Sequence, residues 1–238
     1  IAPFTLCESV VEISKDERDK MRKAAEEANI EVAGLHWLLV SPKGLYVNHS
    51  DSEIRERTKD YFMELIKLCS DLDGKIMVIG SPKERIVVES LTFQQAWDYA
   101  KETFTECAKY AQELNVVLCM EPLSSDQTDF INLPEEGVKM VEEVDNPNFK
   151  LILDVYSSSK EDVDIPAAIR KYAKHLAHFH SNDDNGYLPG SGGVDYPAII
   201  EALKEIDYKG YLSTEVFDFE PDPVIIARKS YDFLSSII

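Results

Sequence analysis

Runs of apolar residues alternate with amphipathic stretches from one end of the chain to the other. In the amphipathic stretches, apolar positions recur every three or four residues, the period of a helix with one buried face, most clearly from Trp97 to Leu114. Ser14 and Glu17 have the spacing of a capping box, which predicts the start of the first helix. The first half is therefore expected to contain helices over about 14–28, 52–72 and 97–114, and strands over about 1–4, 30–40 and 75–81.

The second half repeats one unit four times, a nearly continuous apolar strand followed by an amphipathic helix. Strands that are apolar on both faces are typical of a parallel sheet packed between layers of other structure. The predicted strands are VVLCMEP, KLILDV, HLAHFHS and GYLSTEVF. The predicted helices begin at Pro134, at Pro166, near Asp195 and after Pro221, because proline suits the first turn and aspartate suits the cap.

This order of elements predicts an α/β fold, a TIM (β/α)8 barrel that lacks the first βα unit at the N-terminus of this chain. Seven strands are counted when residues 1–4 are included, and closed barrels typically need ~250 residues. No linker or shift in composition divides the chain, so residues 1–238 are expected to form one domain. The alternative is an open doubly wound sheet, but no glycine-rich phosphate-binding motif follows an early strand.

Composition and charge argue against some classes of binding partner. The formal net charge of −19 opposes binding to nucleic acid or anionic lipid, so we expect a small-molecule substrate and neither a nucleic-acid nor a membrane partner. No apolar run approaches the ~20 residues that span a bilayer. The four cysteines lack CxxC spacing, which indicates a reduced, cytoplasmic protein. The oligomeric state is left open, and a homo-oligomer is one state that the sequence allows.

Metal-competent side chains stand at the ends of the last four predicted strands. They are Glu121, Asp154, His180 and Glu215, each about one βα unit from the next. In barrel enzymes the reactive side chains lie at the carboxyl ends of the strands, so these four are expected to surround one point. Three carboxylates and one imidazole form a hard, mostly oxygen site, which favours one divalent ion, Mn²⁺ first, with Mg²⁺ or Co²⁺ as alternatives.

Each of these residues also has an ordinary structural interpretation. A carboxylate at a strand end is more often a helix cap or a surface ion pair. His178 lies two residues before His180 on the same strand face, so either histidine could be a hydrogen-bonded core residue. The metal prediction rests on the set, because four coincidences at one end of four consecutive units are hard to explain as caps.

Two further segments are candidates for the mouth of the barrel. His36 and Trp37 end an apolar run, so they are predicted to bind substrate, although core packing explains Trp37 equally well. The glycine-rich stretch 189–193 follows a late strand, where barrels commonly bind anions. A flexible turn before Asp195 is an equal alternative for that stretch.

Several blocks carry a family resemblance: MEPLSSDQTDFIN, LILDVY, HLAHFHSNDDNGYLPGSGGVDY and GYLSTEVFDFEPDP. They resemble the xylose isomerase-like TIM-barrel superfamily, the sugar phosphate isomerase/epimerase group that includes the tagatose and psicose 3-epimerases. The resemblance spans essentially the whole chain and implies that the first βα unit is absent before Ile1. It places the family's metal ligands on the four residues already identified by spacing.

In these 3-epimerases, the two ligating glutamates exchange protons with the carbon next to a metal-bound carbonyl. The resemblance therefore implies catalytic roles for Glu121 and Glu215, one removing a proton and the other returning it on the opposite face. The ion would stabilise the enediolate that forms from a ketose or keto-polyol. Monodentate ligation would leave one oxygen of each glutamate free to act.

The sequence departs from the epimerase pattern at three positions. Epimerases carry a histidine three residues after the ligand aspartate, where this chain has Ser157, and an acidic residue where it has Gln127. The arginine expected six residues after the ligand histidine is Gly186. Because these positions contact substrate in the family, Gln127 and Ser157 are predicted to bind a different substrate here. Asp183 or Asp184 could replace a lost contact, with a solvated loop as the alternative.

A metal-dependent sugar isomerase or epimerase is the leading functional hypothesis. A dehydratase of the inosose or dehydroshikimate type is the second, because it begins with the same proton abstraction. A phosphodiesterase resembling AP endonucleases would need several metals and a basic groove, which the charge of −19 opposes. A non-catalytic sugar-binding module or subunit is the fourth hypothesis.

Overall fold

The computed structural model describes residues 10–216 and 218–238 of the chain. The described strands form one parallel sheet in which each strand pairs with the next along the chain. The strands are β1 (Gly34–Leu35), β2 (Ile76–Ile79), β3 (Val117–Met120), β4 (Phe149–Asp154), β5 (Leu176–Ser181) and β6 (Leu212–Thr214). An all-parallel sheet in sequential order is the arrangement of a barrel rather than of an open doubly wound sheet.

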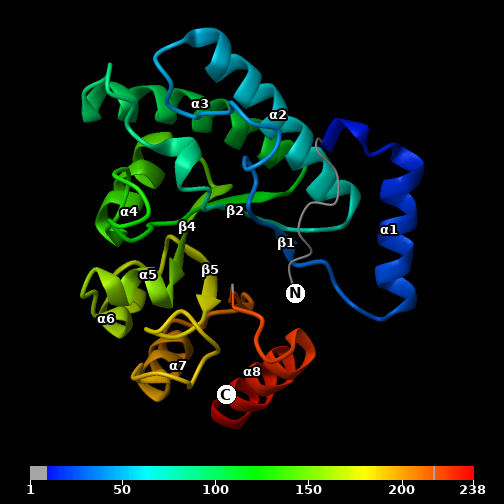
Figure 1. Ribbon diagram of the computed structural model, residues 1–238, viewed down its shortest axis with the longest axis vertical. Helices are drawn as coiled ribbons and strands as arrows, with labels where there is room; N and C mark the ends of the chain where they lie inside the picture. Colours follow the sequence, from blue (N-terminus) through cyan, green and yellow to red (C-terminus); the bar gives the residue numbers. More distant parts are fainter. Residues whose placement is uncertain (1–9, 217) are drawn as a thin grey trace.

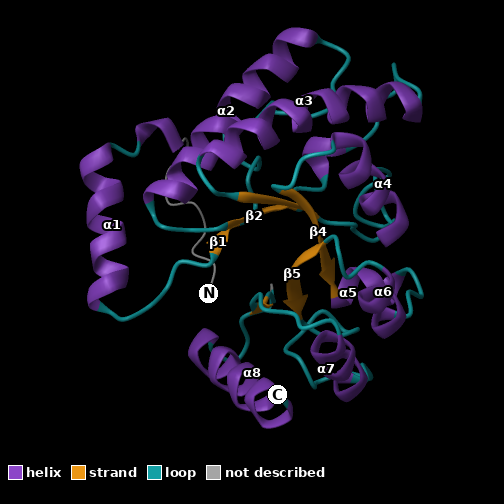
Figure 2. Ribbon diagram, turned by 180° about the vertical axis from the view of Figure 1, so that it is seen from behind, coloured by secondary structure: helices purple, strands orange, loops and turns teal. Residues whose placement is uncertain are grey.

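Helices lie on the outside of the curled sheet, and the strands form an arc within them (Figure 1). The same arrangement is seen from behind in Figure 2. The α-helices are α1 (Lys15–Glu27), α2 (Ser52–Asp71), α3 (Phe93–Glu113), α4 (Pro134–Val144), α5 (Val155–Lys160), α6 (Ile165–Lys171), α7 (Tyr196–Glu205) and α8 (Pro223–Ile237). Two short 3-10 helices are η1 (Val10–Glu12) and η2 (Lys83–Arg85). None of the described helices is both long and apolar enough to cross a membrane.

The helix predicted from its apolar period is α3, and its inner face confirms the prediction. Trp97, Ala100, Phe104, Cys107 and Ala111 are all buried. They join a core cluster with residues of α2, β2 and β3. Burying each large apolar side chain contributes roughly 1.5–3 kcal/mol, so this face fixes α3 against the sheet.

The register of the sheet brings the strand ends level with one another. Asp154 at the end of β4 pairs with His180 of β5, and His180 pairs with Ser213 of β6. Glu121 and Glu215 stand one residue beyond β3 and β6, and their amides still donate to the neighbouring strands, to Ile79 O and Ser181 O. All four predicted ligands therefore lie together at the carboxyl ends of the strands.

The structure confirms the predicted fold class and the capping box at Ser14. The strand expected over 30–40 is wrong in extent, because only Gly34–Leu35 pairs and Trp37 adopts a left-handed φ of 56° that ends the extended backbone. Helix α5 was not predicted, since its sequence VYSSSK looks like a polar loop. The strand predicted over 1–4 lies outside the described residues.

Candidate metal centre

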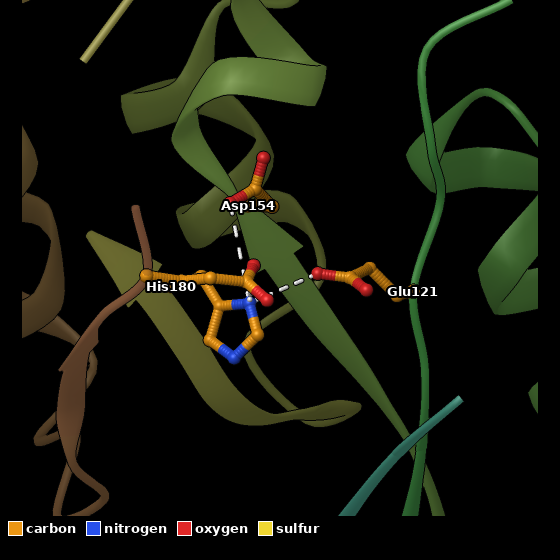
Figure 3. A group of neighbouring side chains, drawn as sticks. Glu121, Asp154 and His180 are labelled. Atoms are coloured by element: carbon orange, nitrogen blue, oxygen red, sulfur yellow. Dashed lines mark ion pairs between the residues drawn. The ribbon is translucent and has the colours of Figure 1, made fainter. Parts of the chain in front are cut away.

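Glu121, Asp154, His180 and Glu215 come together at the carboxyl ends of β3, β4, β5 and β6. One ligand atom from each lies within 4.8 Å of the others. Nδ1 of His180 lies 3.0 Å from Oε1 of Glu121, 2.8 Å from Oε2 of Glu215 and 4.0 Å from Oδ2 of Asp154. Figure 3 shows the side chains of Glu121, Asp154 and His180 pointing toward one another from separate strands.

The donor set fits a cation. Oε1 of Glu121 and Nδ1 of His180 are buried, and although they lie 3.0 Å apart as an ion pair, neither forms a hydrogen bond with a described residue. Leaving such buried polar atoms unsatisfied costs about 1–3 kcal/mol each, and more for charged groups. A divalent ion between the four side chains would satisfy both atoms and offset the repulsion between three carboxylates. The cluster is therefore a candidate site for a divalent metal.

The charges concentrated in the cluster shift the pKa values of its side chains. Burial, and then the carboxylates of Glu121 and Glu215, raise the pKa of Asp154 to about 7. Burial disfavours a charged His180, yet Glu215 and Glu121 outweigh it and raise the pKa of that imidazole well above its usual value. Burial would also raise the pKa of Glu215, but His180 and His36 outweigh it and lower that pKa. The raised pKa values of Asp154 and His180 show that the concentrated negative charge favours a proton or a cation at this point.

Asp154 is held on both carboxylate oxygens. Its Oδ1 accepts a 2.7 Å hydrogen bond from the amide of Ser157 and so caps α5, while its Oδ2 accepts a 2.7 Å bond from Nδ2 of Asn182. Asn182 is itself fixed, because its Oδ1 accepts from the amide of Tyr156 at 2.7 Å. The cap interpretation and the metal interpretation of Asp154 are therefore compatible: the hydrogen bonds that make it a cap also orient it toward the cluster.

Glu121 is positioned by its neighbours in the turn after β2. A Cβ on Gly80 would lie 2.0 Å from Oε2 of Glu121, so glycine at this position leaves room for the carboxylate where it now lies. The guanidinium of Arg85 donates to the carbonyl of Glu121 at 2.7 Å and to that of Ile79 at 3.3 Å. Arg85 is 1% exposed, and burial lowers its pKa to about 10. A buried cation thus lies beside the carboxylate cluster.

His36 follows β1, the outer strand on the other side of the described sheet from β6, and its side chain reaches the cluster. Its Nδ1 lies 3.0 Å from Oε1 of Glu215, and its ring lies edge-on to that of His180 with centroids 6.2 Å apart. Trp37 is 37% exposed beside it. His178 lies behind His180, with ring centroids 5.3 Å apart, and burial, together with His180, lowers its pKa to about 3. His178 is therefore a neutral residue of the barrel interior.

The remaining predicted residues lie in the segments that follow β3, β4 and β5, with Ser157 in helix α5. Nε2 of Gln127 contacts Oγ of Ser157 at 3.5 Å, so these two positions that depart from the epimerase pattern are neighbours. Gly186 has a φ of +74° and packs against the ring of Tyr156. The solvated-loop interpretation holds for Asp184, which is exposed, and fails for Asp183, which is fully buried.

Asp183 organises the loop of residues 184–194, which contains the glycine-rich stretch 189–193. Its carboxylate accepts from the amides of Gly190 at 2.8 Å, Asp184 at 3.0 Å and Val194 at 3.3 Å. These contacts give the loop a defined conformation beside the cluster. They also leave the Asp183 carboxylate fewer lone pairs for any other partner.

Sequence reasoning missed Asn182 and Arg85. Asn182 stands two residues after His180, just beyond a strand, where a polar side chain could reach the neighbouring strand end. Arg85 follows the strand that precedes Glu121, but its burial depends on packing that no local pattern reports. Only the position of Asn182 carried a usable signal.

A curled parallel sheet with carboxylates and an imidazole gathered at its carboxyl edge defines a barrel protein with a candidate metal centre. A family model described as xylose isomerase-like TIM barrel matches residues 2–237. The chain therefore belongs to the xylose isomerase-like TIM-barrel family.

Curated relatives include two enzymes named D-psicose 3-epimerase. That of Ruminiclostridium cellulolyticum is 31% identical over 171 residues, which cover 70% of this chain and 58% of the enzyme. That of Agrobacterium fabrum is 29% identical over 211 residues, which cover 87% of this chain and 71% of the enzyme. The chain thus matches less than two thirds of the length of the first relative.

Solved structures show the same fold. A D-psicose 3-epimerase crystallised in the presence of D-fructose has a TM-score of 0.85 at 24% identity, covering 96% of this chain and 86% of that chain. A 3-keto-D-glucoside 4-epimerase from E. coli has a TM-score of 0.83 at 20% identity, covering 93% and 85%. At these identities the likeness concerns the fold alone.

Proposed function

We propose that this chain is a divalent-metal-dependent sugar epimerase or isomerase of the cytoplasm that acts on a ketose or a related keto-polyol. The observation that carries the proposal is the pair Glu121 and Glu215, whose carboxylates both lie within 3.0 Å of Nδ1 of His180. They come from β3 and β6, which are separated by two strands, so they approach the centre from different directions. Relatives named psicose and ribulose 3-epimerases support a ketose as substrate.

The four side chains of the cluster would hold the ion. Three carboxylates and one imidazole suit Mn²⁺, with Mg²⁺ and Co²⁺ as alternatives. When bound, the ion supplies positive charge that stabilises the negative charge developing on a substrate carbonyl oxygen.

The two glutamates would carry out the proton transfers. One accepts the proton from the carbon beside the carbonyl, and the electron pair of the broken C–H bond moves toward the carbonyl oxygen. The other glutamate returns a proton to the same carbon from the opposite face, which inverts its configuration. Each glutamate has a second oxygen outside its contact with His180: Oε2 in Glu121, and in Glu215 Oε1, which lies 3.0 Å from Nδ1 of His36.

Residues in the segments around the cluster would select the substrate. We propose that His36, Trp37, Gln127 and Ser157 contact it, and that Asp183 contributes through the loop that it holds. Gln127 and Ser157 form a neutral amide–hydroxyl pair, where the epimerases that the sequence resembles carry an acidic residue and a histidine. A neutral pair offers hydrogen bonds to sugar hydroxyls without charge, so we expect a substrate preference different from that of those enzymes.

Incubation with a panel of ketoses and cyclic keto-polyols in deuterated water with Mn²⁺ tests the proposal. We expect deuterium at the carbon beside the carbonyl and an epimeric product by NMR, and a loss of roughly 10²–10⁴-fold in rate for Glu121→Gln and Glu215→Gln. Asp184→Asn, in the exposed loop, is the matched control. An alkene product would assign the dehydratase reaction instead. Absence of exchange across the panel by protein shown to hold Mn²⁺ would contradict both reactions.

A further inference from the structure

The two oxygens of Glu215 have different partners. Oε2 lies 2.8 Å from Nδ1 of His180, within the cluster, while Oε1 lies 3.0 Å from Nδ1 of His36. Both contacts join a carboxylate oxygen to an imidazole nitrogen. Glu215 is thus held between a candidate ligand and a residue outside the ligand set.

The backbone restrains Glu215 less than it restrains Asp154 and His180. Strand β6 has only three residues, all half-buried, and it is the last strand of the described sheet, paired only with β5. By contrast, β4 and β5 have six residues each and a strand on both sides. A long side chain on a short edge strand keeps rotational freedom unless another group fixes it.

His36 is itself well placed to fix that side chain. It follows β1, and the next residue, Trp37, turns the chain with a φ of 56°. For a residue other than glycine, this conformation costs roughly 1–2 kcal/mol, so the surrounding structure must impose it. The edge-on contact with His180 also limits rotation of the His36 ring.

We propose that His36 is the positioning residue of Glu215. An ionised carboxylate only accepts hydrogen bonds, so Nδ1 of His36 carries the ring's N–H and donates a hydrogen bond to Oε1. This bond leaves Oε2 directed at the cluster, ready to bind a cation without reorganisation. The inference rests on the proposed metal-dependent function and deepens it, because it assigns to His36 a role in building the site that substrate contact alone would not include.

Mn²⁺ affinity, measured by electron paramagnetic resonance of the free ion without any substrate, tests this role. We expect His36→Ala to bind Mn²⁺ about tenfold more weakly, at the lower end of the ~10–100-fold range for partners of metal ligands. The amide nitrogen of His36→Asn can take the place of Nδ1, so this variant should retain affinity within about threefold. His36→Gln, whose nitrogen corresponds to Nε2 instead, should behave like the alanine variant.

Two controls separate this role from a general loss of structure. His175→Ala removes a histidine at the opposite end of β5 and should leave Mn²⁺ affinity unchanged. Thermal melting of the metal-free variants should match that of the parent chain. Unchanged affinity in His36→Ala, or equal losses in the asparagine and alanine variants, would overturn the inference. Failure of the parent chain to bind Mn²⁺ contradicts the proposed metal centre itself, and that result is obtained before any variant is compared.

Discussion

The central and edge strands of the sheet position their ligands in different ways. Asp154 and His180 lie on β4 and β5, in the middle of the second half of the sheet, and Asp154 is fixed by a backbone amide and by Asn182. Glu215 follows the short edge strand β6 and is fixed by the side chain of His36, 179 residues away in the sequence. The difference shows that the central ligand Asp154 is oriented by groups at the ends of its own and the neighbouring strand, whereas the edge ligand depends on a contact across the sheet.

Removing a central ligand should have the largest effect. We expect His180→Ala to weaken Mn²⁺ binding by more than ~100-fold, which is the upper end of the loss expected when a residue that hydrogen-bonds to a metal ligand is removed. The reason is that His180 contacts both glutamates and contributes the nitrogen of the site. Isothermal titration with Mn²⁺ measures the change, and His175→Ala is the control. A variant that binds Mn²⁺ as tightly as the parent chain would remove His180 from the site.

Removing a residue that holds a central ligand should have the next largest effect. Asn182→Ala deletes a 2.7 Å hydrogen bond to Oδ2 of Asp154 and leaves the amide of Tyr156 without its partner. We expect affinity for Mn²⁺ to fall toward the upper part of the ~10–100-fold range, and further than in His36→Ala. Asn185→Ala, in the exposed loop nearby, is the matched control. If Asn182→Ala lost less Mn²⁺ affinity than His36→Ala, the edge ligand Glu215 would depend more on its partner than the central ligand Asp154 does, contrary to our expectation.

Crowding the space beside Glu121 should have the smallest effect of the three. In Gly80→Ala, the new methyl group would lie 2.0 Å from Oε2 of Glu121, so the carboxylate must rotate away. Because that oxygen ends a flexible side chain, we expect a loss of Mn²⁺ affinity below about tenfold. Gly193→Ala is the control, since its Cβ would lie 3.1 Å from the end of the Asp184 side chain. Equal affinity in the two variants would show that the position of Oε2 does not matter for binding.

Much of the central part of the site could be predicted from the sequence. Each of the strands β3 to β6 has a chemistry-bearing residue at or just after its end, with helical segments between the strands, and parallel strands necessarily present these ends on the same side of the sheet. That geometric rule is enough to bring Glu121, Asp154, His180 and Glu215 together. The ligand atoms of the four side chains lie within 4.8 Å of one another, as that rule predicts.

The parts that escaped prediction depend on contacts between distant segments. The bond between His36 and Glu215 requires the sheet to curl, and the burial of Arg85 requires packing around η2. Helix α5 forms from a polar sequence because Asp154 caps it. Likewise, Asp183 resembles a surface residue until its loop folds around it. In each case the determining interaction is absent from the local sequence pattern.

The contact between His36 and Glu215 has a consequence for how the protein folds. Closing a loop of 179 residues is entropically costly and comes after the local helices and neighbouring strands have formed. The site is therefore complete only when the side chains that follow β1 and β6 have come into contact. In a refolding experiment, recovery of Mn²⁺ binding should follow recovery of helical circular dichroism, so metal binding reports the last stage of folding.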